Sequence, residues 1–188
     1  VLVLCTGKMT KRIEEFQGHS KEYTATLQLG ATTARYDMEH EVNAVYPTTG
    51  ITRERIEEVL AQFVGDIQQV PPTYSACKVN GNRAYELRRK GRDVELAPKN
   101  IHIDAIDILG FDADEMRLDI RVACGKGTYI RALARDIGRA LGSGAYLTAL
   151  CRTRVGAFRV EDSIAFDSFA EWLDNQKIEN NEEENKQI

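Results

Sequence analysis

Apolar and polar side chains alternate along some segments of the chain and recur at helical spacings along others. Residues 21–29 alternate strictly, which predicts a strand with one buried face. Residues 101–111 and 115–124 are typical of two paired strands, and the second of them alternates as well. Residues 52–63 place apolar side chains three and four positions apart, which predicts a helix. These segments indicate a sheet covered by helices.

Shorter patterns fill the rest of the chain. Residues 1–5 are an apolar run, which predicts a buried strand, and residues 8–16 predict a short helix after it. Residues 30–47 have no clear period, so we expect a loop or a pair of short strands there. Residues 155–160 are expected to form a closing strand. Residues 166–173 predict a short helix whose apolar side faces inward.

A glycine-led turn at residues 125–127 passes directly into the most informative helical pattern. Glycine permits a sharp turn or a close approach of another group at this position. Beyond it, apolar side chains repeat at spacings of three and four, and Arg131, Arg135 and Arg139 recur at i, i+4 and i+8. We therefore expect a helix with one packed side and one charged side formed by these arginines.

Positive charge is concentrated in one part of the chain. Residues 117–159 hold nine Lys or Arg against two acids, whereas the whole chain has a net charge of -4. The natural partner of such a region is a polyanion. Residues 83–92 form a second basic segment, which includes Tyr85, and a solvated helix explains it almost as well as phosphate contacts do.

The order of the elements and the composition favour one soluble globular domain. Strands and helices do not alternate in a regular β-α-β series, which favours an α+β domain over residues 1–173, built on a mixed, mainly antiparallel sheet with flanking helices. No apolar run approaches the ~20 residues of a membrane span. Residues 174–188 are polar and acidic, and we expect this tail to be disordered.

Several classes of chemistry find no support in the sequence. The four cysteines contain no C-x-x-C pair and the three histidines stand in no ligand-like spacing, so we expect no metal site and interpret the cysteines as buried free thiols in a reducing compartment. No Ser-His-Asp or Cys-His-Asn set can be assembled. The glycine-led turn lacks the spacing of a nucleotide-binding P-loop, because Gly127 separates Lys126 from Thr128.

Four segments, taken together, resemble successive motifs of the TruB-type tRNA pseudouridine synthases, in the family's order. They are Lys21-Glu-Tyr-Thr-Ala, Val70-Pro-Pro-Thr-Tyr-Ser-Ala-Cys-Lys, Lys126-Gly-Thr-Tyr-Ile-Arg and Gly144-Ala-Tyr-Leu-Thr-Ala-Leu-Cys-Arg-Thr. The resemblance runs from residue 1 to about residue 173. It implies the pseudouridine synthase fold and the conversion of uridine to pseudouridine at position 55, in the T arm of tRNA, without metal or organic cofactor. The reduced cysteines further predict a cytoplasmic location, and we expect a monomer. Such an enzyme must take its target base out of the stack.

The resemblance also assigns two catalytic positions. Tyr23 matches the aromatic residue against the uracil, which is thought to help remove the proton from C5, and Arg131 matches the arginine that pairs with the catalytic aspartate. The pattern of residues alone favours a core tyrosine at position 23 and an arginine simply on the basic face at position 131. A guanidinium bordering an apolar stripe can nevertheless reach a buried carboxylate in a fork-like pair.

Further positions are assigned to substrate binding. Tyr129 and Leu150 match residues that line the uracil pocket, and Lys78 and Arg83 resemble the region that clasps the T arm through phosphate contacts. Lys126 and Arg152 complete the expected substrate-binding set.

Two departures from the family bear on activity. The family's nucleophilic aspartate lies in a Gly-x-x-Asp-x-x-Ala-Thr-Gly motif, with an upstream histidine, immediately before a strand like residues 1–4, and the sequence contains neither. We expect this chain to be inactive by itself and an upstream segment to supply the aspartate; Asp104 and Asp107 have no support as substitutes. We expect no C-terminal RNA-binding module of the kind many bacterial relatives carry after residue 173, so affinity for tRNA would rest on the main domain. A non-catalytic tRNA-binding or tRNA-folding protein on the same scaffold is therefore the alternative.

Overall fold

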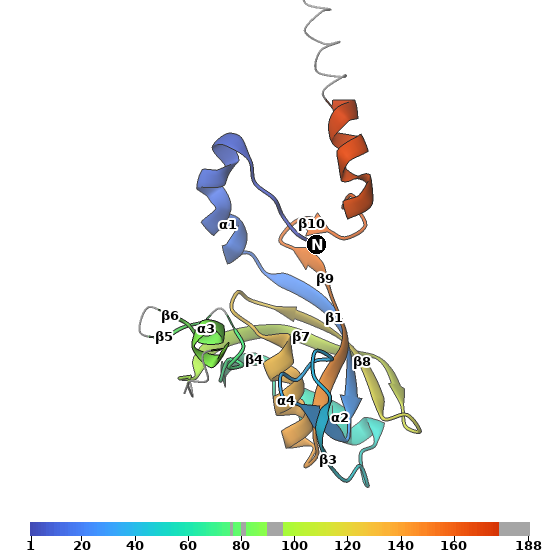
Figure 1. Cartoon of the computed structure of the whole chain (residues 1–188). Helices are drawn as coiled ribbons and strands as arrows, with labels where there is room; N and C mark the ends of the chain where they lie inside the picture. Colours follow the sequence, from blue (N-terminus) through green and yellow to red (C-terminus); the bar gives the residue numbers. More distant parts are fainter. Residues whose placement is uncertain (76, 80–81, 90–95, 177–188) are drawn as a thin grey trace, which may run out of the picture.

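The computed structural model describes residues 1–75, 77–79, 82–89 and 96–176 (Figure 1). Its centre is a six-stranded sheet with the order β10-β9-β1-β8-β7-β4, in which every neighbouring pair is antiparallel. The strands are β1 (Lys21–Leu29), β4 (Gly65–Gln69), β7 (Lys99–Asp112), β8 (Arg117–Cys124), β9 (Ala145–Val155) and β10 (Phe158–Arg159). The predicted α+β fold with a mainly antiparallel sheet is confirmed.

Two helices, α2 (Arg53–Ala61) and α4 (Ile130–Ala140), pack on one face of this sheet (Figure 1). Thr52 caps α2 because its Oγ1 accepts a hydrogen bond from the Arg55 amide at 3.3 Å. The buried apolar side chains of both helices meet the alternating inner row of β1 in one hydrophobic core. The periodicities of residues 21–29, 52–63 and 130–141 therefore predicted this layer correctly.

Shorter elements surround this core. They are η1 (Gly7–Arg12), α1 (Ile13–Gly18), β2 (Ala31–Thr33), β3 (Val42–Val45), β5 (Lys78–Val79), β6 (Asn82–Arg83), α3 (Ala84–Arg89) and η2 (Phe166–Ser168). The short helix expected at residues 8–16 and the pair of short strands expected within residues 30–47 are present as η1 with α1 and as β2 with β3.

The prediction of a buried strand at residues 1–5 was wrong. These residues form no regular element, and the Leu2 and Leu4 side chains are 74% and 70% exposed. An apolar run becomes a strand only where its backbone pairs with a neighbour. Here the Val1 nitrogen donates to the Arg152 carbonyl at 2.5 Å without starting a ladder.

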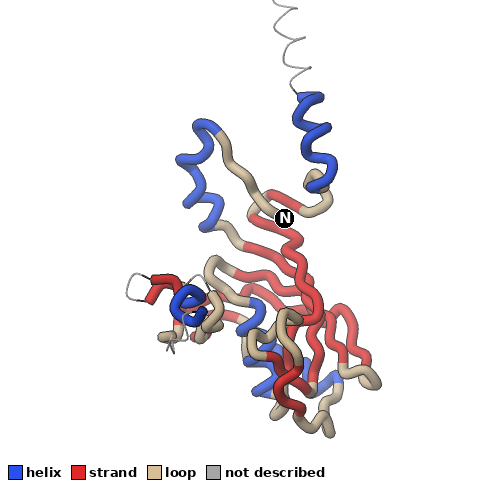
Figure 2. The backbone as a smooth tube through the Cα atoms, viewed as in Figure 1, coloured by secondary structure: helices blue, strands red, loops and turns tan. Residues whose placement is uncertain are grey.

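The inward-facing helix at residues 166–173 was also predicted wrongly. A helix does form there, as η2 continued to residue 176, but it points away from the sheet (Figure 2) and none of its residues is buried. Phe166 is 92% exposed. Periodicity gives a helix an apolar side but does not supply the surface that covers it. The predicted disorder of residues 174–188 is wrong for residues 174–176, which belong to this helix, and residues 177–188 lie outside the described residues.

The cysteine prediction was only partly correct. All four cysteines are free, but only Cys77 and Cys124 are buried, while Cys5 is half-buried and Cys151 exposed. Within the described part of the chain, no helix combines the length and the apolar character needed to cross a membrane.

Candidate active site

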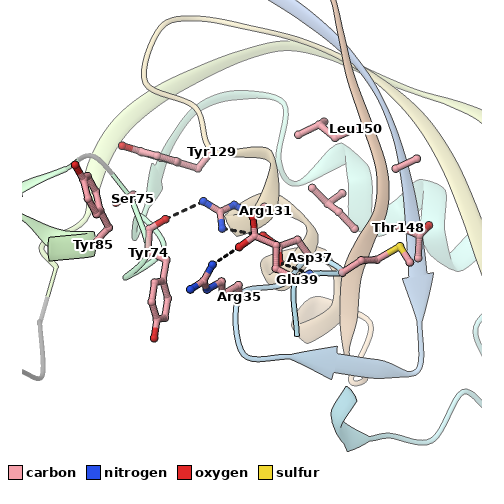
Figure 3. A pocket seen from close by; sticks show the side chains of 13 residues that line it. Arg35, Asp37, Glu39, Tyr74, Ser75, Tyr85, Tyr129, Arg131, Thr148 and Leu150 are labelled. Atoms are coloured by element: carbon pink, nitrogen blue, oxygen red, sulfur yellow. Dashed lines mark hydrogen bonds and ion pairs between the residues drawn. The ribbon is translucent and has the colours of Figure 1, made fainter. Parts of the chain in front are cut away.

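A pocket of about 570 Å³ opens beside the N-terminal end of α4 (Figure 3). Its lining comes from parts of the chain that are distant in sequence: residues 35 and 37–39 between β2 and β3, residues 74–75, Tyr85 of α3, residues 129 and 131, and residues 147–150 of β9. Charged, aromatic and aliphatic side chains thus face one cavity.

Arg131 is fixed in this pocket by two hydrogen bonds. Its Nη1 donates to Asp37 Oδ2 at 2.9 Å, and its Nη2 donates to the Tyr74 carbonyl at 2.8 Å (Figure 3). The side chains are 26% exposed for Arg131 and 19% for Asp37. A guanidinium has five N–H donors, so Arg131 retains donors for a second acid.

Hydrogen bonds to both its side chain and its backbone also fix Asp37, the partner of Arg131. Its Oδ1 accepts from the Glu39 amide at 3.1 Å, while its backbone amide donates to Thr33 Oγ1, also at 3.1 Å. The hydroxyl of Thr33 in turn donates to the Asp37 carbonyl at 2.6 Å. Asp37 was not predicted from the sequence, because it lies in a segment without periodicity, where a threonine and an aspartate four residues apart were the only signal.

The predicted charged side of α4 was wrong for Arg135. This arginine is 9% exposed, with its Nε 2.8 Å from Asp136 Oδ1 and its Nη2 donating to the Val70 carbonyl at 2.9 Å. Only Arg139 is exposed. Arg131 and Arg135 instead bind carbonyl oxygens of residues 70–74 and so fasten that segment to α4. A spacing of four puts residues on one side of a helix but cannot say which neighbour covers that side.

Tyr129 and Leu150 line the same pocket as Arg131. Buried Gln69 fixes the backbone of Tyr129: its Nε2 donates to the Tyr129 carbonyl at 3.2 Å and its Oε1 accepts from the Tyr129 amide at 2.9 Å. Leu150 is 48% exposed on β9. Three of the predicted site residues are therefore brought together around one cavity.

Tyr23 is not among the residues that line this pocket, but it is close by on the sheet. It lies opposite Arg152 in the pairing of β1 with β9, two residues from the pair of Ala25 with Leu150. Burial raises the pKa of the Tyr23 phenol above its ordinary value, and a hydrogen bond with Arg152 acts in the opposite direction. The phenol is therefore protonated at neutral pH.

The remaining predicted binding residues lie elsewhere. Arg152 is directed to the start of the chain, since its Nε donates to the Val1 carbonyl at 2.8 Å. Lys126 is exposed at the glycine turn and does not line the pocket. Lys78 and Arg83 are paired between β5 and β6, and their side chains lie outside what the structure describes.

The two acids considered as substitute nucleophiles lie on β7, away from this pocket. Asp107 Oδ2 accepts from Arg121 at 2.6 Å, and Asp104 Oδ1 lies 3.6 Å from His102 Nε2. Within the described ranges, no three His, Cys, Asp or Glu side chains are grouped to hold a metal ion.

His102 is expected to titrate above the ordinary histidine pKa of about 6.5. Its Nδ1 lies 2.8 Å from Asp66 Oδ1, and this hydrogen bond raises the pKa by favouring the imidazolium. The resulting stabilisation is present below the unfolded-state pKa and is lost as the pH rises through the folded-state pKa. NMR titration of the imidazole nitrogens measures the shift. Asp66→Asn should lower this pKa, and an unchanged value would contradict the assignment.

The chain is similar to known proteins over nearly its whole length. Residues 1–130 match the family described as "TruB family pseudouridylate synthase (N terminal domain)", and residues 131–186 match "tRNA pseudouridylate synthase B C-terminal domain". The protein named tRNA pseudouridine synthase B of Bacteroides thetaiotaomicron is 62% identical over 98% of this chain and 78% of its own length. The protein of the same name from Flavobacterium johnsoniae is 44% identical over 92% of this chain and 75% of its own length.

Solved structures show the same fold. "Crystal Structure of a Cbf5-Nop10-Gar1 Complex" matches with a TM-score of 0.65 and 25% identity, covering 90% of this chain and 40% of that one. "Structure of H/ACA RNP bound to a substrate RNA containing 2'-deoxyuridine" matches with a TM-score of 0.63 and 22% identity, covering 94% of this chain and 41% of that one. The chain thus spans about two fifths of the length of these structural relatives.

Proposed function

Because this chain belongs to the TruB family of pseudouridylate synthases, we propose that it isomerises uridine to pseudouridine in tRNA. The four family motifs support position 55 of the T arm as the target. The resemblance further supports catalysis that needs neither metal nor organic cofactor, with residues 1–173 as part of the catalytic domain, and we expect a cytoplasmic monomer.

The observation that carries this proposal is the meeting of Arg131, Tyr129 and Leu150 in one pocket. A flipped uracil needs an aromatic or apolar wall to replace the stacking it loses, which costs a few kcal/mol. Tyr129 and Leu150 offer such walls. Arg131, already oriented by Asp37, offers a cation beside them.

We propose that the nucleophilic aspartate comes from polypeptide upstream of Val1. In the family motif it precedes this position by about six residues, which span at most about 20 Å when extended. The Val1 nitrogen contacts the Arg152 carbonyl, and Arg152 is two residues along β9 from Leu150, or about 7 Å. An aspartate entering from there is within reach of the unused donors of Arg131.

The other residues are assigned by resemblance. Tyr23 would assist proton removal from C5. Arg152 would bind substrate beside it, since Arg152 lies opposite Tyr23 in the pairing of β1 with β9. Lys78, Arg83 and Lys126 would contact RNA phosphates. These contacts position the RNA without reading its sequence.

A test requires the natural gene product with its upstream segment. Incubating it with a T-arm stem–loop carrying 5-tritiated uridine should release tritium and yield pseudouridine, in the presence of EDTA as well. An RNA with cytidine at the target position serves as the control. Absence of pseudouridine with the uridine substrate would overturn the proposal and favour the non-catalytic tRNA-binding alternative, which the names of the relatives do not support.

A further inference from the structure

Arg35 stands at the boundary of two neighbouring cavities. It lines the 570 Å³ pocket of the candidate site and also an adjacent pocket of about 510 Å³. Its Cζ lies 4.2 Å from the centre of the Tyr74 ring, and Arg131 hydrogen-bonds to the carbonyl of the same tyrosine (Figure 3). Stacking on an aromatic ring orients the planar guanidinium.

The ion pair made by Arg35 differs from the one made by Arg131. Arg35 Nη1 pairs with Glu39 Oε2, and the Glu39 side chain is 63% exposed, whereas Asp37 is 19% exposed. An ion pair with an exposed carboxylate is weak, so Glu39 is easily displaced. The buried Nε of Arg35 has no hydrogen-bond partner among the described residues. Arg35 thus combines a replaceable acid with an unused donor.

We propose that Arg35 binds a phosphate of the substrate RNA at the mouth of the pocket, and that Glu39 forms its ion pair with the Arg35 guanidinium only while RNA is absent. The inference rests on the proposed function, because it takes RNA as the substrate. A phosphodiester has two unbridged oxygens that can accept two parallel hydrogen bonds from one guanidinium. The exchange replaces a single-donor contact with a two-donor contact.

The local charge favours a phosphate over a base at this position. Asp37 neutralises Arg131, so displacement of Glu39 leaves one uncompensated positive charge, which attracts a polyanion. A base cannot enter between Arg35 and Tyr74, because a separation of 4.2 Å already represents direct stacking. In the competing arrangement, a base stacks on the outer face of the guanidinium. Loss of that stacking would weaken RNA binding without changing its salt dependence.

The test measures the affinity of the natural full-length protein for the T-arm stem–loop at several salt concentrations. Arg35→Gln should raise Kd about tenfold and reduce the slope of log Kd against log salt concentration by about 0.9, the loss of one phosphate contact. Glu39→Gln should lower Kd by about threefold, as expected for removing a weak competing ion pair. In the Arg35→Gln background, Glu39→Gln should have no effect.

The chain provides a matched control on α2. Arg53 and Glu57 form another exposed i,i+4 pair, with Nε and Oε1 3.1 Å apart. Arg53→Gln and Glu57→Gln remove the same charges and should leave Kd and the salt slope unchanged. Arg35→Lys keeps the charge but not the paired donors of the guanidinium. It should raise Kd by a smaller factor and retain the slope of log Kd against log salt concentration. If Arg35→Gln does not fold, the Kd and the salt slope of Arg35→Lys still test the proposal.

Two results would overturn the inference. One is an Arg35→Gln protein with wild-type Kd and salt slope, and the other is a raised Kd with an unchanged slope, which would indicate base stacking. Either is interpretable only if the wild-type protein forms pseudouridine. A wild-type protein that binds the RNA without forming pseudouridine would instead overturn the proposed function.

Discussion

Arg131→Ala, introduced into the natural full-length protein, should reduce kcat for pseudouridine formation by at least about 10²–10³-fold while changing the Kd for the T-arm RNA by less than about threefold. Loss of one preoriented donor at a reacting centre has this magnitude. The guanidinium is fixed at 2.9 Å from Asp37 and 2.8 Å from the Tyr74 carbonyl. Its removal therefore takes away the partner of the proposed nucleophile and leaves Asp37 Oδ2 without its hydrogen-bond donor.

Single-turnover tritium release and filter binding separate the two effects. Arg139→Ala is the matched control, because Arg139 belongs to the same helix and is exposed two turns further on; its kcat should remain within about threefold of wild type. Arg131→Lys keeps the charge but not the two-pronged geometry and should also be strongly impaired. Wild-type turnover by Arg131→Ala would remove this residue from the site.

Gly138→Ala should lower the free energy of unfolding by about 3 kcal/mol, at the upper end of the cost of overpacking. A Cβ built on Gly138 collides with the Ala145 amide nitrogen and would lie 2.6 Å from the Gly144 carbonyl carbon and 2.9 Å from the Ala145 Cβ. Two of these three atoms belong to the backbone, so α4 and β9 must move apart. The gain in helix propensity, about 1 kcal/mol, offsets the collision only in part.

Urea denaturation followed by circular dichroism measures this change. Gly18→Ala is the control, because Gly18 also lies in a helix but has no heavy atom within 4 Å of the added Cβ. It should alter stability by less than about 1 kcal/mol. Equal effects of the two substitutions would show that α4 does not approach β9 as closely as the structure indicates.

The sequence by itself determined the central layer of the fold and the family. The alternation in residues 21–29 and the helical spacing in residues 52–63 match β1 and α2 closely. These patterns succeed because each records, within a few neighbouring residues, which side of an element is buried. The four motifs identified the family for the same reason, since each is a short continuous segment.

Only the tertiary structure decided which charged groups meet. Arg131 and Asp37 are 94 positions apart, and Asp37 lies in a segment without periodicity, so no local pattern could pair them. Arg135 has the same place in the sequence pattern as Arg131, yet it is buried against residues 70–74. The exposed apolar residues 2 and 4 and the uncovered helix beyond residue 166 have the same explanation. Periodicity describes one side of a contact, and the surface on the other side comes from elsewhere in the chain.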